Sequence, residues 1–296
     1  MELIRLKGVV YTRATFAAPW GVDVPAGPYA QFRLIVSGTC VLNTGSGNLL
    51  TLKSGDMIFF PHGAAHWLAD APDSPRLSGT ELLAAVRAGQ PIFTGTGAST
   101  TMITGHVEFD RSANHPFLTA LPPFIQITDA ERRELSWLEQ TSEFIMNEVR
   151  ADRMGSQFIV SRLAEVLFIH TIRAYVEQTR AETGFLRALQ DEPISNALGV
   201  IHAHPERNWT LANLSKEAGL SRTGLANRFR DLVGETPIGY LTTWRILKAK
   251  ALLTTHPEPI HEIARQVGYQ SEAAFNRVFK KRVHQTPAVY RRMAGR

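Results

Sequence analysis

The chain of 296 residues is 44% hydrophobic and carries a net charge of +5. This length predicts two domains, and the hydrophobic content is sufficient for two buried cores. No stretch reaches the roughly 18 apolar residues of a transmembrane helix, and the first residues lack the apolar run of a signal peptide. The single cysteine, Cys40, excludes an internal disulfide and a Cys-rich zinc site. We therefore expect a cytoplasmic protein without a membrane partner.

Residues 1–128 have the pattern of an all-β domain. Short apolar runs at residues 32–38, 39–43, 49–56 and 57–61 are separated by Gly, Asn and Ser, which favour turns. Closely spaced short strands of this kind favour a small barrel or a jelly roll.

The stretch from Gly55 to His66 contains the pattern G.....P.G..H. It resembles the second motif of the cupin family, and in particular the cupin-like sensor domain that precedes many DNA-binding domains of the AraC type. The segment from Phe109 to Ile127 is similar to the end of that sensor domain. The resemblance implies a cupin-like β-barrel at residues 1–128 that responds to a small molecule or another signal.

A catalytic cupin is the alternative, in which a His of this motif joins a His-x-His and a Glu to hold a metal. The corresponding stretch here, Tyr29–Arg33, has neither His nor Glu, and the spacing of His106 and His115 does not support a site. We therefore expect no metal, no cofactor and no enzymatic activity. His62 and His66 are interpreted as structural residues or as lining an effector pocket. A metal-dependent cupin enzyme fused to a DNA-binding domain remains the alternative function.

Two further features of this region have competing interpretations. Cys40 is interpreted as a small buried hydrophobe and, against it, as a thiol redox sensor, although no second cysteine could pair with it. Residues 74–102 are rich in Gly, Ser and Thr and are expected to form a mobile loop, either a disordered spacer or a lid over the barrel mouth. A strand is expected to follow at residues 103–109.

The sequence pattern of residues 129–188 predicts helices. Asp129 can cap a first helix, which Gly155 and Ser156 end, and a second helix is expected from about residue 157 to residue 178. This second helix is too apolar for a lone surface helix. We expect part of it to pack on the barrel and part to form a homodimer interface, the alternative being that all of it is intramolecular core.

Residues 211–237 predict a helix-turn-helix unit, in which Gly219 ends one helix and Ser221 caps the next. Residues 260–282 predict a second such unit, and a shift of 50 residues superimposes Ser221 on Ser271. A duplicated motif is much harder to obtain by chance than a single one. The intervening residues, 237–253, predict one long linker helix that begins with a proline.

Four blocks carry a resemblance to the DNA-binding domain of the AraC/XylS family of bacterial transcriptional regulators. They are AGLS at residues 218–221, P..Y....R...A..LL at 237–253, IA..VGY..E..F.R.FK at 263–280 and TP..YR at 286–291. His284 departs from the family, which usually has Gly there, so a helix would end at this residue with some strain. The resemblance implies an α+β protein of two domains, in which residues 189–296 form the all-α DNA-binding domain of an activator or repressor.

The charge is concentrated on this second domain. Residues 1–188 contain 16 basic and 18 acidic residues, whereas residues 189–296 contain 16 basic and 9 acidic residues. A basic surface gains affinity for nucleic acid by neutralising phosphates and releasing counterions. We therefore expect double-stranded promoter DNA as a partner, together with a small-molecule effector, a second copy of the chain and RNA polymerase. A purely architectural DNA-bending protein is a further alternative.

The second helix of each unit is expected to enter a major groove, the two grooves being successive ones on one face of the DNA. Arg222, Asn227 and Arg277 are the candidates for bonding base edges, and Arg230, Lys280 and Lys281 are the candidates for phosphates. The full set of candidate DNA contacts is Arg222, Thr223, Ala226, Asn227, Arg230, Glu272, Ala273, Asn276, Arg277, Lys280 and Lys281.

Overall fold

The computed structural model describes residues 7–45, 47, 49–108, 116–151, 153–179 and 184–294. These residues form two compact units, an α+β barrel unit and an all-α helical unit. The barrel unit contains the described residues up to 108 and residues 121–179, without residue 152, and the helical unit contains residues 116–120 and 184–294. The predicted fold class is confirmed, while the exact boundaries at residues 128 and 188 stay predictions.

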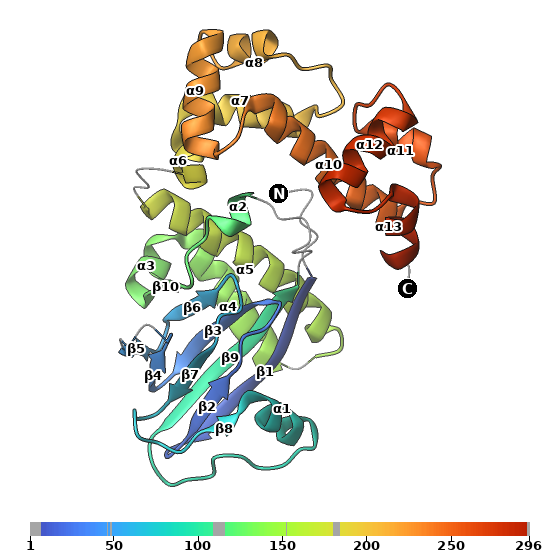
Figure 1. Ribbon diagram of the computed structural model, residues 1–296. Coiled ribbons are helices and arrows are strands. Elements are labelled where there is room, and N and C mark those ends of the chain that lie inside the picture. Colours follow the sequence, from blue (N-terminus) through green and yellow to red (C-terminus); the bar gives the residue numbers. More distant parts are fainter. Residues whose placement is uncertain are drawn as a thin grey trace. The chain divides into compact units, whose positions relative to one another are not determined.

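The barrel unit is built from two five-stranded sheets (Figure 1). One sheet has the order β1-β9-β3-β6-β10 and the other β5-β4-β7-β2-β8, and all pairs are antiparallel except β2 with β8. The strands are β1 Lys7–Ala17, β2 Gly21–Val24, β3 Ala30–Ser37, β4 Thr39–Asn43, β5 Leu49–Lys53, β6 Met57–Phe60, β7 His66–Ala69, β8 Leu77–Ser78, β9 Ser99–Glu108 and β10 Ile125–Ile127.

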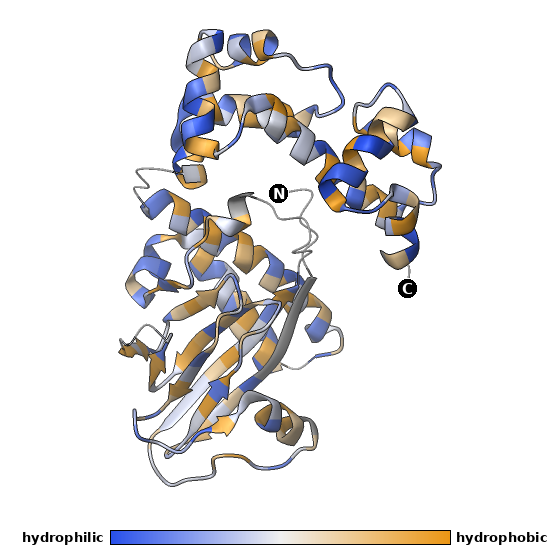
Figure 2. Ribbon diagram, in the orientation of Figure 1, coloured by the Kyte–Doolittle hydropathy of each residue, from blue (hydrophilic) through white to orange (hydrophobic). Residues whose placement is uncertain are grey.

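The core of the barrel unit lies between these sheets and beneath one long helix. Side chains from both sheets, including Trp20, Leu42, Ile58 and Phe60, make one buried cluster. Helix α5, Ser156–Gln178, covers the β1-β9-β3-β6-β10 sheet, where the rings of Phe168 and Phe59 lie 5.1 Å apart. In Figure 2 orange, apolar segments occur along the strands of both sheets, where they alternate with more polar ones. Part of the second predicted helix packs on the barrel, as expected.

Three local predictions for this unit are wrong. Residues 79–87 form helix α1, Gly79–Arg87, where a mobile loop was expected, because Ser78 and Glu81 form a capping box that starts a helix. The residue that caps the helix beginning at Asp129 is Thr128, and not Asp129 as predicted. The first predicted helix is also two helices, α3 Asp129–Glu134 and α4 Ser136–Ala151.

The helical unit contains the duplicated helix-turn-helix pair. Its helices are α2 Pro116–Thr119, α6 Gly184–Gln190, α7 Glu192–Ala203, α8 Leu211–Glu217, α9 Arg222–Val233, α10 Pro237–Thr255, α11 Ile260–Gln266, α12 Glu272–Val283 and α13 Pro287–Ala294. The first helices of the two units, α8 and α11, have 7 residues each, and the second helices, α9 and α12, have 12 residues each. The long linker helix between them is α10, as predicted.

The duplication extends to the packing of the side chains. Phe229 meets Tyr240 edge to face at 5.8 Å, and Phe279 meets Tyr290 edge to face at 5.7 Å. Each pair joins the second helix of a unit to the helix that follows it. Aromatic rings favour this geometry because the positive edge of one ring faces the negative face of the other.

Candidate nucleic-acid interface and ligand cavity

We call α9 and α12 the recognition helices. Ser221 caps α9 by accepting a hydrogen bond from the amide of Gly224 at 3.0 Å, and Ser271 caps α12 by accepting one from the amide of Ala274 at 3.2 Å. Each cap satisfies an amide that the first turn of a helix leaves without an intrahelical partner. Two fully buried aromatic or aliphatic side chains then fix each helix, and these are Leu225 and Phe229 in α9 and Phe275 and Phe279 in α12.

Nine of the eleven candidate DNA contacts are exposed on the recognition helices, and the other two are half-buried. The exposed ones are Arg222, Thr223, Asn227 and Arg230 on α9, and Glu272, Ala273, Arg277, Lys280 and Lys281 on α12. Ala226 and Asn276 are half-buried, and the side-chain amide of Asn276 donates to the carboxylate of Glu272 at 3.5 Å. Each helix therefore presents a row of cationic and amide side chains, the types that bond phosphates and base edges.

One exposed arginine of α9, Arg228, is bonded to another helix of the same unit. Arg228 donates from Nε to Oδ2 of Asp191 at 3.0 Å. Asp191 is only 3% exposed and also caps α7, accepting from the amide of Ile194 at 3.3 Å. Because burial of a carboxylate is costly unless it is paired, this ion pair fixes α9 to the start of α7.

Arg245 on the linker helix α10 connects the segment before the first helix-turn-helix unit to the turn of the second. Its Nε donates to the carbonyl of Pro205 at 2.7 Å, and its Nη2 donates to the carbonyl of Arg207 at 2.8 Å, both just before α8. The same guanidinium lies 5.6 Å from the ring centre of Tyr269, which follows α11. Its planar fork, with five donors, allows one side chain to bond two carbonyls and stack on a ring.

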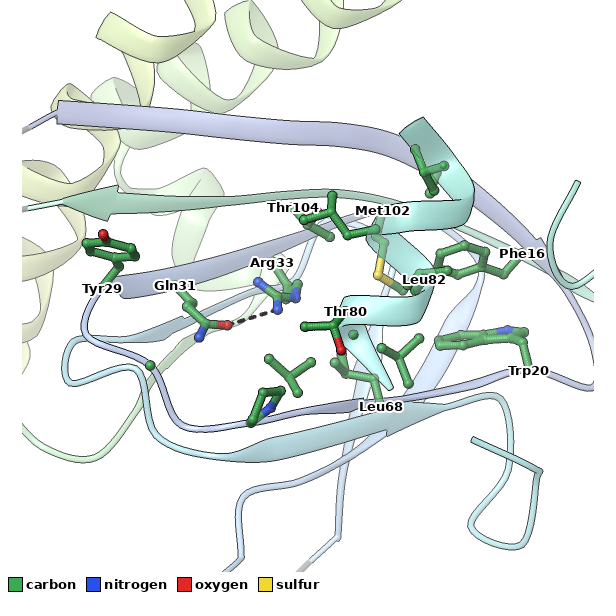
Figure 3. A pocket seen from close by; sticks show the side chains of 18 of the residues that line it. Phe16, Trp20, Tyr29, Gln31, Arg33, Leu68, Thr80, Leu82, Met102 and Thr104 are labelled. Carbon is green, nitrogen blue, oxygen red and sulfur yellow. Dashed lines mark hydrogen bonds between the residues drawn. The ribbon is translucent and has the colours of Figure 1, made fainter. Parts of the chain in front are cut away.

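The barrel unit contains a ligand-sized cavity at one end of its core. Its volume is about 270 Å³. Its walls come from β1, β2, β7, β9 and helix α1, and Figure 3 shows Phe16, Trp20, Leu68, Leu82 and Met102 around it. The polar side chains that line it are those of Tyr29, Gln31, Arg33, Thr80 and Thr104. Small-molecule sites have this composition of apolar walls and a few convergent polar groups.

Arg33 is the charged group of the cavity and is 7% exposed. Its Nη1 donates to the carbonyl of Phe32 at 2.8 Å, and its Nη2 donates to Oε1 of Gln31 at 3.1 Å (Figure 3). Its Nη2 also lies 3.5 Å from Nε2 of His66. These contacts restrict the orientation of the guanidinium, because both of its terminal nitrogens have partners.

The tautomer of His66 follows from its second contact. Nδ1 of His66 lies 2.8 Å from the carbonyl oxygen of Ala64, and since a carbonyl only accepts, Nδ1 carries the proton. Nε2 is then the acceptor that faces Arg33. Burial, and after it the charge of Arg33, lower the pKa of His66 to about 3, so the imidazole is neutral at neutral pH.

Neither histidine predicted to line an effector pocket lines this cavity. His66 lies behind Arg33 and borders a more open hollow of about 520 Å³. His62 donates from Nε2 to the carbonyl of Leu121 at 2.9 Å, which is the structural role given as its alternative. The polar side chains that line the cavity come from β3 and the residue before it, from β9 and from α1, and the effector role of the two histidines stays a prediction.

The strand position that carries metal ligands in catalytic cupins carries Gln31 and Arg33 here. A guanidinium in the cavity repels a cation, so this place does not fit a metal. Among the residues that the structure describes, no three His, Cys, Asp or Glu side chains form a group that could hold a metal. Nε2 of His106 donates to a carboxylate oxygen of Glu108 at 3.1 Å, and His115 lies outside the described residues.

Sequence reasoning missed two features of the cavity, the side chain of Arg33 and helix α1. In the sequence the stretch that contains Arg33 is notable only for its lack of metal ligands, and residues 79–87 have the composition of a loop. The pattern Ser-x-x-Glu at Ser78–Glu81, followed by Leu82, Leu83 and Val86 at helical spacing, is the signal that identifies α1.

In the part of the chain that the structure describes, no helix is long and apolar enough to cross a membrane.

Comparison with known proteins agrees with both units. Residues 1–177 match the family model described as Cupin, and residues 214–293 match the one described as Helix-turn-helix domain. The HTH-type transcriptional regulator AlkR of Acinetobacter baylyi is 30% identical over 296 residues, which cover 98% of this chain and 97% of the relative. An AraC-like transcription regulator of Streptomyces lividans is 30% identical over 294 residues, covering 99% and 96%. A solved structure of the DNA-binding domain of AdpA, in complex with a target DNA, is 29% identical with a TM-score of 0.34, covering 34% of this chain and 92% of that chain. The chain therefore belongs to the AraC-type family of helix-turn-helix transcriptional regulators with an N-terminal cupin domain, and it is a DNA-binding transcriptional regulator.

Proposed function

We propose that this regulator reads a specific DNA sequence with α9 and α12 and that a small molecule in the barrel cavity modulates the binding. The observation that carries the first part is the pair of matched recognition helices, each exposing cationic and amide side chains over a fully buried core. Arg222, Asn227 and Arg277 are assigned to base edges, because their side chains can form paired hydrogen bonds. Arg230, Lys280 and Lys281 are assigned to phosphates.

The second part of the proposal is supported by the cavity, whose apolar walls and buried Arg33 provide space and an orienting group for a ligand. A metal-dependent cupin enzyme is less well supported, because the guanidinium of Arg33 occupies the place where metal ligands would converge. Contact with RNA polymerase and location in the cytoplasm stay predictions that follow from the family.

We also propose a homodimer that forms through α4 and α5. Helix α5 has two apolar faces, of which one is buried in the barrel unit and one is exposed. The exposed face carries Phe158 and Ile159, 82% and 47% exposed, and Val166 lies on the same face seven residues after Ile159. Phe144 of α4 is 65% exposed. Large apolar patches on a helix pair are typical of subunit interfaces, and a second copy of the chain can bury the same patch symmetrically.

Selection of the DNA fragments that the protein binds tests whether it recognises a specific base sequence. Purified full-length protein is incubated with a pool of genomic fragments at two salt concentrations, and the bound fragments are sequenced. We expect a motif of two blocks about one helical turn apart and an affinity that falls steeply with salt. A specificity ratio near one between selected and random DNA would contradict sequence-specific regulation and favour an architectural DNA-bending protein.

A further inference from the structure

We propose that Arg245 of the linker helix α10 fixes the two recognition helices relative to each other and thereby determines which spacing between two DNA blocks the protein accepts. The inference rests on the proposed function, because it requires that α9 and α12 both read base sequence. Arg245 is a positioning residue in this proposal. It acts on DNA through the two units that it connects and makes no DNA contact itself.

Helix α10 contributes to the packing of both helix-turn-helix units. In its first half, Tyr240 meets Phe229 of α9 edge to face. In its second half, Ile246, Ala249 and Leu253 are buried in one cluster with side chains of α11 and α12. Apolar packing of this kind stabilises both units on one helix but is not directional. The orientation of each unit on α10 therefore depends on further, directional contacts, and Arg245 lies between the two halves.

On one side, Arg245 holds the segment that leads into the first unit. Its guanidinium donates to the carbonyls of Pro205 and Arg207. This segment has its own internal bonds, since the carbonyl of His204 accepts from the amide of Arg207 at 3.2 Å and from Nε1 of Trp209 at 2.8 Å. The residue after Trp209 caps α8, and α8 packs on α9. Arg245 is therefore connected to the first recognition helix through α8.

On the other side, the same guanidinium lies against the turn of the second unit. Its carbon Cζ is 5.6 Å from the ring centre of Tyr269, and this ring lies 5.5 Å from that of Phe275, a fully buried residue of α12. Gly268 allows the close approach. A Cβ at this position would lie 2.7 Å from Nη2 of Arg245 and 2.9 Å from Cα of Glu206. The turn of the second unit therefore meets both Arg245 and the backbone that precedes the first unit.

The bonds of Arg245 distinguish it from a phosphate contact. Its side chain is half-buried, and Nε and Nη2 both donate to carbonyls of the protein. Arg230 on α9 is instead exposed. A planar guanidinium can bond two carbonyls and stack on a ring at the same time, which an ammonium cannot do with the same geometry. We therefore expect Arg245 to connect protein segments and not to neutralise a phosphate.

A rigid connection between two reading helices makes DNA affinity depend on spacing. Linked binding elements bind most tightly when their separation matches that of their two sites, because the second contact is then intramolecular. One inserted base pair moves one block by about 3.4 Å and rotates it by about 35° around the DNA axis. A rigid pair of helices cannot follow this change. A looser pair loses some affinity on the matched DNA and tolerates the altered spacing better.

Binding of the full-length protein to duplexes of different spacing tests the inference. Each duplex carries one pair of the selected blocks, either at the selected spacing or with one base pair inserted or removed between them. We expect the parent protein to bind the altered duplexes roughly ten- to a hundredfold more weakly in fluorescence anisotropy. For Arg245→Gln this penalty should fall to about threefold or less. A folded Arg245→Gln that keeps the full penalty, or a parent protein that shows none, would overturn the inference.

Three further variants act as controls. Arg245→Lys keeps the charge without the planar fork and should tolerate the altered spacing as Arg245→Gln does. A strict spacing preference in Arg245→Lys would overturn the role of the fork. Tyr269→Leu removes the stacked ring from the side of the second unit and should also relax the preference. It decides the inference if Arg245→Gln does not fold, as judged by circular dichroism. Arg265→Gln changes an exposed arginine that pairs with Glu262 on α11 and should keep the strict preference.

The salt dependence separates a positioning role from a phosphate contact. Arg245→Gln should leave the slope of log Kd against log salt concentration unchanged on the matched duplex, whereas Arg230→Gln should reduce it by about 1. A slope reduced to the same extent in Arg245→Gln would assign Arg245 to a phosphate and overturn the positioning role.

The selection experiment separates this inference from the proposed function. A motif of two blocks whose spacing preference does not depend on Arg245 refutes the inference and leaves DNA reading intact. A motif of one block contradicts reading by both recognition helices, and the inference fails with it. Failure to select any motif contradicts the DNA-reading part of the proposed function and removes this inference as well.

Discussion

His284 holds the left-handed backbone conformation that Gly234 holds fifty residues earlier in the first helix-turn-helix unit. The φ angles are +61° at His284 and +85° at Gly234, and each residue ends a recognition helix by donating its amide to a carbonyl of the last turn. A side chain at position 234 would meet no atom within 4 Å. The two positions therefore have the same backbone conformation, which glycine adopts at little cost and histidine adopts with strain.

Replacing His284 with Gly should stabilise the protein, because the left-handed conformation costs a residue with a Cβ roughly 1 kcal/mol or more. We expect His284→Gly to raise the free energy of unfolding by about 0.5 to 1 kcal/mol in chemical denaturation of the full chain. The matched substitution Gly234→Ala should lower it by about 1 kcal/mol. Destabilisation by His284→Gly would show that the imidazole makes a contact that outweighs the strain.

Arg277 should contribute sequence specificity as well as affinity. Arg277→Ala is expected to cost about 1 to 3 kcal/mol on the selected DNA motif and to relax the preference at one base pair. Arg265→Ala is the control, since Arg265 is an exposed arginine on the first helix of the same unit and pairs with Glu262. An equal loss on the motif and on scrambled DNA would assign Arg277 to a phosphate.

Cys40 should be unreactive in the folded protein. Burial, and after it the negative charge of Asp56, raise the pKa of the Cys40 thiol to about 12, so a fraction on the order of 10⁻⁵ is thiolate at pH 7. We expect iodoacetamide to modify Cys40 slowly in the native protein and rapidly in urea, as followed by mass spectrometry. Rapid modification of the native protein together with altered DNA affinity would support the redox-sensor alternative.

Stability should fall as the pH is lowered, in part because of His66. The folded-state pKa of His66 is about 3 and its ordinary value is 6.5. Between these values the unfolded chain binds a proton that the folded protein does not, so acid favours unfolding, by at most about 1.4 kcal/mol per pH unit. His66→Gln should flatten the dependence of the unfolding free energy on pH between pH 7 and pH 4. An unchanged slope would show that His66 is not buried as a neutral group.

Phe158 should be essential for dimerisation. A charge on the exposed face of α5 would have to be buried at the interface, which is costly without a partner. We therefore expect Phe158→Glu to shift the full-length protein from dimer to monomer in sedimentation velocity. Gln157→Glu adds the same charge at the neighbouring exposed residue and should leave the dimer intact. A monomeric parent protein, or a dimer that survives Phe158→Glu, would exclude this face as the interface.

The sequence was sufficient to predict the helix-turn-helix pair because its signals are local. Ser221 caps α9, and Ser271, which the duplication places at the equivalent position, caps α12. Helix α1 could have been predicted from Ser78 and Glu81, because a capping box depends only on residues three apart.

The cavity could not be predicted, because its decisive contact joins residues distant in sequence. In the cavity wall, Arg33 and His66 are 33 positions apart. The same holds in the helical unit, where Asp191 and Arg228 are 37 positions apart. Only the pairing of the strands and the packing of the helices bring such residues together. The cupin-like pattern identified the neighbourhood of the site through His66, while the side chains that face the ligand space follow from the register of β3 with β6.

The two helix-turn-helix units are alike in length, but α9 is additionally held by the buried carboxylate of Asp191. This carboxylate forms an ion pair with Arg228 of α9 and also caps the start of α7, a few residues after the helical unit begins at residue 184. Helix α12 packs against the linker helix α10 in one apolar cluster. A displacement of the start of α7 would therefore act on α9 through this ion pair, whereas α12 is connected to the same region through α10.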